Sequence, residues 1–174
     1  PIIDFIINGE GEYRFVEFLK NINNGYIDLK SDGLCGYYNG ESFFNYQIDR
    51  IENLDILPLP AYDKLPMEKY FKFNIPFSPF PRGKRVMQIY TSRGCPVGCT
   101  FCASTNFNKK YIARSPENVY KEIEYYIEKY NIDEIQFADD NLTFSKSRSI
   151  YFFGLLKKLN IQWCTPNGIM VNTL

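Results

Sequence analysis

Histidine is absent from this sequence of 174 residues. Imidazole is the commonest side-chain metal ligand and the general base of Ser-His-Asp triads. Its absence excludes His-ligated metals, such triads and imidazole acid–base catalysis within these residues.

Long hydrophobic runs and an excess of one charge are missing as well. The longest apolar stretches, such as 1–7 and 150–156, are far shorter than the roughly 20 residues that span a bilayer. Lys plus Arg and Asp plus Glu each number 20, so no net charge favours nucleic acid or an anionic membrane as a partner. No charged-then-apolar leader opens the sequence. We therefore expect a cytoplasmic protein.

Cysteine is scarce and unevenly spaced. An odd count of five, without a secretory signal, argues against a disulfide framework. Three of the five fall between positions 95 and 102, and such clustering indicates metal or redox chemistry. The five are Cys35, Cys95, Cys99, Cys102 and Cys164.

Residues 86–174 alternate between strand and helix patterns. Ser115 followed by Pro116 is a helix start signal, because Ser caps the first turn and Pro suits the first helical position. The order strand, helix, strand, helix, strand predicts a parallel α/β arrangement, open or barrel-like. The expected strands are 86–91, 133–138 and 161–165, and the expected helices are 116–131 and 145–159.

Residues 1–85 are patterned less regularly. An apolar run over 2–7 is typical of a buried strand, and a Gly-rich turn and a helix over 13–21 follow it, as in a doubly wound α/β domain. Asn39-Gly40 predicts a hairpin. Six of the ten prolines lie in 57–84, a density that predicts an extended connector without regular structure. Both ends of the sequence look cut from something longer, so we expect a fragment.

The clustered cysteines form a Cys-x3-Cys-x2-Cys loop directly after a strand. Thiolates are the soft ligands that iron–sulfur clusters and zinc select. Gly94, Pro96 and Gly98 allow the backbone to turn tightly around a common point. Three sulfurs are one fewer than a closed cubane usually takes, so one iron would stay open to a substrate or cofactor.

Zinc and the absence of any metal are the alternatives to a cluster. Structural zinc usually takes four ligands, so it would need the distant Cys35 or Cys164. Three cysteines without any metal are disfavoured because clustered exposed thiols are a redox liability. We rank a cluster above zinc, and zinc above no metal.

The loop carries a family resemblance. With Arg93-Gly94-Cys95-Pro96 at its start and Phe101 before its last cysteine, it resembles the radical S-adenosylmethionine (SAM) superfamily, and more narrowly the cobalamin-binding branch. Weaker matches run through nearly the whole chain in family order. They are 9–12, 54–60 with 62–63, 114–117, 137–141 with Phe144, and 166–169.

The resemblance implies a fold. Residues 86–174 would form the N-terminal half of a radical SAM partial (β/α) barrel. Residues 1–24 would be the tail of a Rossmann-like cobalamin-binding domain, and 25–85 a hairpin and Pro-rich connector.

The resemblance also implies a chemistry. Cys95, Cys99 and Cys102 would hold a [4Fe–4S] cluster whose fourth iron binds the amino and carboxylate groups of SAM. An electron from a donor such as flavodoxin or ferredoxin would cleave SAM to methionine and a 5′-deoxyadenosyl radical, which removes hydrogen from a small-molecule substrate. In the cobalamin branch the outcome is often methyl transfer, and in some members ring formation.

Four other residues are expected at the cofactor. Phe101, Asp139, Asp140 and Asn141 match the family's positions. Side chains of a strand alternate, so Ile135 and Phe137 should face the helices. Asp140 then shares the interior side with Glu134, Gln136 and Ala138, while Asp139 is expected to cap the loop that follows it.

Some features depart from the family's pattern. The cobalt-ligand motif Asp-x-His-x-x-Gly requires a His, and Met170 stands where relatives usually have Arg. A cobalamin-free enzyme such as a methylthiotransferase is one alternative, although that class usually brings three further cysteines and only Cys35 is present outside the core region. A non-catalytic metal-binding module is the other. Finally, Lys109, Lys110 and Arg114 predict a small solvated basic face.

Overall fold

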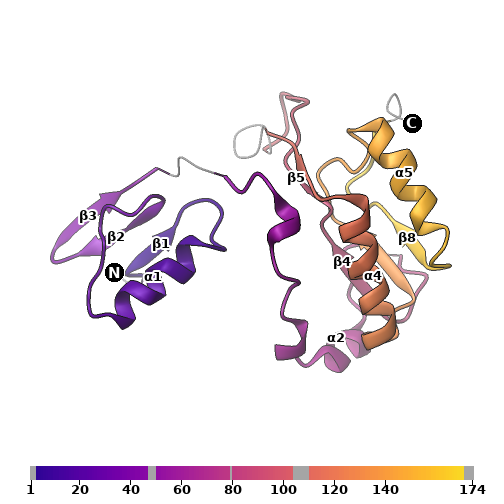
Figure 1. Ribbon diagram of the computed structural model, residues 1–174, viewed down its shortest axis with the longest axis horizontal. Helices are drawn as coiled ribbons and strands as arrows, with labels where there is room; N and C mark the ends of the chain where they lie inside the picture. Colours follow the sequence, from indigo (N-terminus) through magenta and orange to yellow (C-terminus); the bar gives the residue numbers. More distant parts are fainter. Residues whose placement is uncertain (1–2, 47–49, 79, 104–109, 171–174) are drawn as a thin grey trace. The chain divides into compact units, whose positions relative to one another are not determined.

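The computed structural model describes residues 3–46, 50–78, 80–103 and 110–170. The chain divides into two compact units, Pro1–Glu52 and Asn53–Leu174 (Figure 1). No helix in the described part of the chain is both long and apolar enough to cross a membrane.

The first unit is a three-stranded antiparallel sheet with one helix. Its strands follow the order β1 (Phe5–Ile7), β2 (Leu34–Tyr38) and β3 (Glu41–Phe44), and α1 spans Arg14–Asn23. The predicted helix and hairpin are both confirmed. Asn39 and Gly40 turn the hairpin with φ angles of 51° and 89°, the left-handed conformation that this pair favours.

The strand expected at the start of the chain is present as β1, but the expectation that it is buried is wrong. Ile6 of β1 is 53% exposed, and β1 lies at the edge of the described sheet, where it pairs with β2 alone. That pairing is antiparallel, whereas a doubly wound sheet is mostly parallel. The Rossmann-like origin of residues 1–24 therefore stays a prediction.

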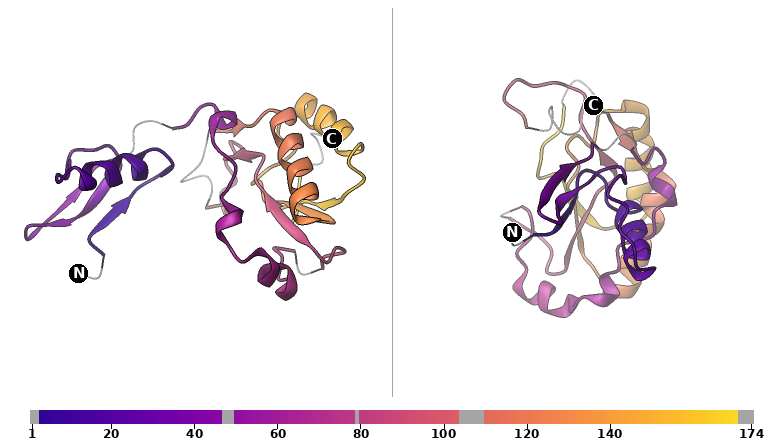
Figure 2. Two further views of the ribbon diagram at one scale, coloured as in Figure 1. Left: turned by 60° about the horizontal axis from the view of Figure 1, so that its bottom comes forward. Right: turned by 90° about the vertical axis from the view of Figure 1, so that its left-hand side faces the viewer.

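The second unit holds the predicted parallel sheet. Its strands β4 (Val86–Ile89), β7 (Glu134–Phe137) and β8 (Gln162–Cys164) lie in that order, joined through α4 (Pro116–Tyr130) and α5 (Lys146–Leu156). Both helices cover one face of the sheet (Figure 2). Ile135 and Phe137 are fully buried in the core on that face, as strand alternation predicted. The other core members include Met87, Ile89, Val119, Ile123, Tyr126, Phe152 and Leu156.

The opposite side of β7 carries polar side chains that hold the Pro-rich segment. The Glu134 carboxylate accepts hydrogen bonds from the backbone N–H groups of Arg82 and Gly83 at 2.6 and 2.7 Å. Gln136 Oε1 accepts one from Ser78 N–H at 2.8 Å. The backbone at Ser78 and at Arg82–Gly83 is thereby fixed against the central strand.

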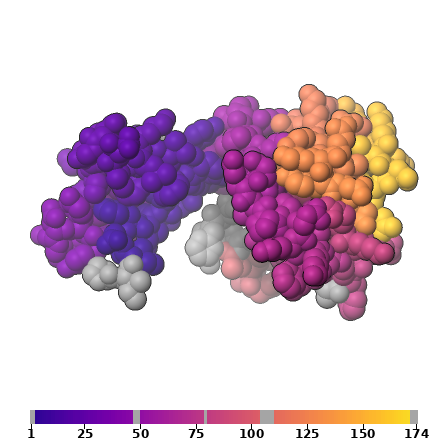
Figure 3. Space-filling view, turned by 90° about the horizontal axis from the view of Figure 1, so that it is seen from below, coloured from indigo at the N-terminus to yellow at the C-terminus, as the bar shows by residue number. Residues whose placement is uncertain are grey.

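The Pro-rich segment is more regular than predicted. It contains the helix α2 (Met67–Phe73) and the 3₁₀ turn η2 (Tyr62–Lys64), and a further 3₁₀ turn, η1 (Leu54–Ile56), directly precedes it. The expectation of no regular structure is wrong at α2 because Pro66 stands just before the helix, where a missing N–H costs nothing. The segment lies on the surface of the second unit beside α4 (Figure 3), with Tyr62 and Tyr126 in ring contact.

The start of α4 is capped as the sequence predicted, and the cap gives a first test. Ser115 accepts a hydrogen bond from Asn118 N–H at 3.2 Å, and Ser115 N–H donates to Asp55 of the connector at 2.9 Å. Ser115→Ala removes the acceptor, so the free energy of unfolding should fall by about 1 kcal/mol. Urea unfolding followed by the fluorescence of Trp163, the single Trp, measures it.

The matched control is Ser147→Ala. Ser147 is exposed within α5, where Ala is the better helix former, so this change should cost no stability. Equal midpoints for the two variants would show that the cap contributes nothing.

Candidate cluster site

The cysteine loop, residues 94–103, follows β4 at the carboxyl edge of the parallel sheet. A two-residue strand β5 (Ser92–Arg93) pairs antiparallel with β6 (Ile112–Ala113) and forms a stem at its base. Ser92 is opposite Ala113 and Arg93 is opposite Ile112. The carboxyl ends of parallel strands are where α/β folds place their ligand sites, so the loop stands at the expected edge.

The loop backbone turns at its glycines. Gly94 and Gly98 have φ angles of 83° and 75°, a conformation that side chains other than Gly rarely adopt. Cys102 N–H donates to Cys99 C=O at 3.1 Å and closes a tight turn between two of the predicted ligands. Cys95, Cys99 and Cys102 are all partly exposed, and none is in a disulfide.

These three thiols fit an iron–sulfur cluster in their chemistry. They are soft ligands, they share one short loop, and they are open enough to be reached by metal. Among the described residues, no three Cys, Asp or Glu side chains are close enough to hold a metal ion. Convergence of the three sulfurs on a cluster is therefore part of the proposal below.

The two remaining cysteines lie elsewhere. Cys35 is buried in β2, where its thiol contacts the carbonyl oxygens of Gly33 and Asn45. Cys164 is in β8, and burial together with the nearby Glu134 carboxylate raises the pKa of its thiol. Both cysteines lie outside the loop that carries the three clustered thiols.

Asp139 links the end of β7 to the start of the stem. It is only 2% exposed, and its carboxylate accepts hydrogen bonds from Thr91 N–H at 3.0 and 3.1 Å and from Thr91 Oγ1 at 2.8 Å. Ser92 Oγ donates to the same carboxylate. Burial raises the pKa of Asp139, while these hydrogen bonds and the charge of Arg148 act in the opposite direction. Asp139 thus holds residues 91–92, and not the loop after it as expected from the sequence.

The other predicted cofactor residues lie nearby in the chain but differ in exposure. Asp140 is exposed directly after Asp139, whereas Asn141 is buried and its Oδ1 accepts a hydrogen bond from Thr143 Oγ1 at 3.5 Å. Phe101 projects from the cysteine loop with 92% of its surface exposed. Their roles in cofactor binding stay predictions.

Asn167, from the predicted 166–169 motif, joins the same edge. Its side-chain amide donates to the carbonyl oxygens of Ala138 and Asp139 at 3.0 and 3.2 Å. The ends of β7 and β8 are therefore fixed to one another beside the cysteine loop.

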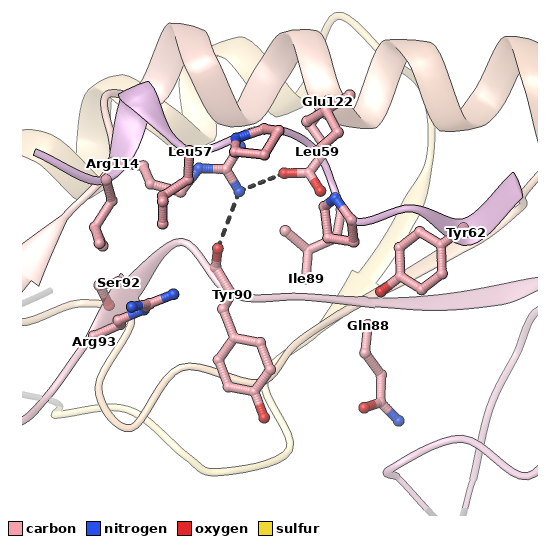
Figure 4. A pocket seen from close by; sticks show the side chains of 13 residues that line it. Leu57, Leu59, Tyr62, Gln88, Ile89, Tyr90, Ser92, Arg93, Arg114 and Glu122 are labelled. Carbon is pink, nitrogen blue, oxygen red and sulfur yellow. Dashed lines mark hydrogen bonds and ion pairs between the residues drawn. The ribbon is translucent and has the colours of Figure 1, made fainter. Parts of the chain in front are cut away.

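Beside the stem lies a pocket of about 180 Å³ that sequence reasoning missed (Figure 4). Arg114 forms an ion pair there with Glu122, which is 3% exposed, and donates to Tyr90 C=O at 3.2 Å. The predicted solvated basic face is therefore wrong for Arg114, because its charge is neutralised within the fold by Glu122. Lys109 lies outside the described residues. The sequence signal that could have indicated this pocket was an acidic residue, Glu122, beside the apolar stripe of α4.

Comparisons with known proteins agree with the sequence resemblance. Residues 89–172 match the family model of the radical SAM superfamily. The chain is 31% identical over 192 residues to cytidylyl-2-hydroxyethylphosphonate methyltransferase of Streptomyces wedmorensis, covering 97% of this chain and 36% of that protein. It is 28% identical over 169 residues to the anaerobic magnesium-protoporphyrin IX monomethyl ester cyclase of Rubrivivax gelatinosus, covering 94% and 29%.

A solved structure shares the fold. The cobalamin-dependent S-adenosylmethionine radical enzyme OxsB, with aqua-cobalamin and S-adenosylmethionine bound, superposes with a TM-score of 0.70 at 21% identity. The match covers 91% of this chain and 22% of OxsB. The chain thus spans about a third of the length of the methyltransferase and the cyclase, and less of OxsB.

Proposed function

Because residues 89–172 make this chain a member of the radical SAM superfamily, we propose that it supplies the cluster site of a radical SAM enzyme. Cys95, Cys99 and Cys102 are the protein ligands. The observation that carries the proposal is the glycine-turned loop at the carboxyl end of β4, which presents three partly exposed thiols. When bound there, a [4Fe–4S] cluster supplies the electron that cleaves SAM reductively.

The chain's own residues bind and orient SAM in this proposal. Asp140, exposed at the end of β7, accepts hydrogen bonds from the ammonium group of its methionine part. The exposed ring of Phe101 contacts the cofactor beside the third cysteine, and Asn141 supports the turn that carries Asp140.

The reaction class we propose is cobalamin-dependent methyl transfer or cyclisation. One relative is named for methyl transfer, and another for ring formation. The chain has no His, so an imidazole ligand to cobalt would not come from these residues. Cobalamin retained by the full-length protein after gel filtration supports this class, whereas its absence favours the cobalamin-free alternative.

The enzymatic proposal is tested by product analysis. The anaerobically reconstituted full-length protein, given SAM and a strong reductant, should release methionine and 5′-deoxyadenosine. Full iron and sulfide loading without either product would leave only the non-catalytic metal module.

Asp140→Ala should weaken SAM binding without removing the cluster. Losing one charge-assisted hydrogen bond should cost roughly 1.5–3 kcal/mol of binding free energy. Calorimetric titration of SAM into the variant and the parent at equal iron content measures the difference.

Asp63→Ala is the matched control. Asp63 is a half-exposed aspartate in η2, outside the cluster site. Equal SAM affinities for the Asp140 and Asp63 variants would show that Asp140 does not bind SAM.

A further inference from the structure

We propose that Asp139 is a positioning residue that fixes the stem of the cysteine loop, and that its carboxylate does not contact the cofactor. The inference rests on the proposed cluster site. It gives different roles to the two neighbouring aspartates, both of which match the family's cofactor positions.

The carboxylate of Asp139 is already occupied by donors from the chain. Oδ1 accepts from Thr91 N–H, Thr91 Oγ1 and Ser92 Oγ, and Oδ2 accepts from Thr91 N–H. Each carboxylate oxygen offers about two lone-pair positions, so Oδ1 has no capacity left for a ligand, while Oδ2 shares the Thr91 N–H and is buried with the rest of the side chain. With 2% of the residue exposed, an ammonium group would have to displace these donors to reach it.

These donors restrain the stem. Thr91 is fully buried, and its carbonyl oxygen accepts from Arg114 N–H at 2.9 Å and from the Arg148 guanidinium at 3.1 Å. Both sides of Thr91 are therefore fixed immediately before the stem. The stem has only two residue pairs, and so short a ribbon is not stable alone. The hydrogen bonds at Thr91 and Ser92 supply the missing restraint.

Asp139 is itself held in place. Asn167, which follows β8, donates a hydrogen bond to the carbonyl oxygen of Asp139. The side chain of Asp139 in turn reaches from the end of β7 to Thr91, which follows β4. One residue thus joins three strand ends at the edge where the thiols stand. Groups that orient metal ligands in this way typically change metal affinity by about 10–100-fold when they are removed.

Comparing Asp139→Ala with Asp139→Asn tests the proposal. Asn retains the shape: its Oδ1 can accept from Thr91 N–H, and its amide can donate to the hydroxyl oxygens of Thr91 and Ser92 after these rotate. It lacks the negative charge. A positioning role therefore tolerates Asn, whereas a contact with the ammonium group of SAM does not.

The measurements use the reconstituted full-length protein. We expect Asp139→Ala to lose iron to a chelator about tenfold faster than the parent. Its reduced cluster should also show an altered electron paramagnetic resonance response to SAM. Asp139→Asn should behave like the parent in both. Asp139→Asn as defective as Asp139→Ala at equal iron content, or Asp139→Ala equal to the parent, would overturn the proposal.

A third readout needs no cluster. The Arg114 amide is bound to the Thr91 carbonyl, so its hydrogen exchange in the cluster-free protein should accelerate in Asp139→Ala and not in Asp139→Asn. Unchanged exchange in Asp139→Ala overturns the positioning role. A parent protein that takes up neither iron nor sulfide would instead end the proposed function, and this exchange measurement would still decide the role of Asp139.

Ser92→Ala guards against a folding defect in Asp139→Ala. It removes one donor and leaves the carboxylate in place, so we expect a smaller increase in iron loss. Combined with Asp139→Ala it should add nothing, since both remove the same contact. Fully additive effects would show that the two residues act separately.

Discussion

Replacing Cys95, Cys99 or Cys102 by Ala, one at a time, is expected to abolish iron and sulfide uptake. Each variant leaves two thiolates on the loop, and two cannot hold a cubane against loss to solvent. The parent protein, reconstituted anaerobically, should be brown and should lose that colour in each variant. Iron and acid-labile sulfide per chain are the quantities to measure.

Cys35→Ala and Cys164→Ala are the matched controls. Cys35 is buried in the other unit, and Cys164 has a thiol of raised pKa. Both variants should bind iron and sulfide as the parent does. Loss of metal in Cys164→Ala, with zinc and no sulfide in the parent, would instead support a four-ligand zinc site.

Phe137→Ala should destabilise the fold more than Ser115→Ala does. Phe137 is fully buried at the end of β7, and its ring contacts those of Phe152 and Trp163 with centroids 5.4 and 5.9 Å apart. Removing a buried ring leaves a cavity and should lower the free energy of unfolding by about 3–5 kcal/mol. Because Trp163 lies against the ring, its fluorescence during urea unfolding reports the change.

Phe101→Ala is the contrasting variant for that experiment. The same truncation at a ring 92% exposed should leave stability within about 0.5 kcal/mol of the parent. A stability loss in Phe101→Ala as large as that in Phe137→Ala would mean that the cysteine loop packs differently from the structure. The variant can also be used to ask whether SAM affinity depends on Phe101.

The parallel α/β part of the fold could be predicted because its signals are local. Ser115 and Pro116 start α4, and the alternation of Ile135 and Phe137 with Glu134 and Gln136 defines the two sides of β7. Such cues depend on neighbouring residues alone, and the sheet order follows from short crossovers. The spacing of the three clustered cysteines is likewise a local signal, and it predicts a metal-binding loop.

The features of the fold and of the site that were not predicted depend on contacts between residues far apart in the sequence. β1 was taken for a buried strand because its residues are apolar, and its sequence shows neither which face of the sheet is covered nor that β2 pairs with it antiparallel. Strand alternation was extended to Asp140, and Asp139 was left to cap the following loop, yet β7 ends at Phe137 and alternation does not apply beyond it. The hydrogen-bond donors to the Asp139 carboxylate belong to Thr91 and Ser92, which lie 48 and 47 positions earlier in the sequence.

The Mössbauer spectrum of the ⁵⁷Fe-reconstituted full-length protein, recorded with and without SAM, shows whether the cysteine loop holds a cluster with one open iron. Three cysteine ligands leave one iron different from the others, so we predict a [4Fe–4S] cluster in which SAM shifts the signal of a single iron site. A cluster whose irons are all unaffected by SAM, or a protein that binds no iron, would contradict the proposed site.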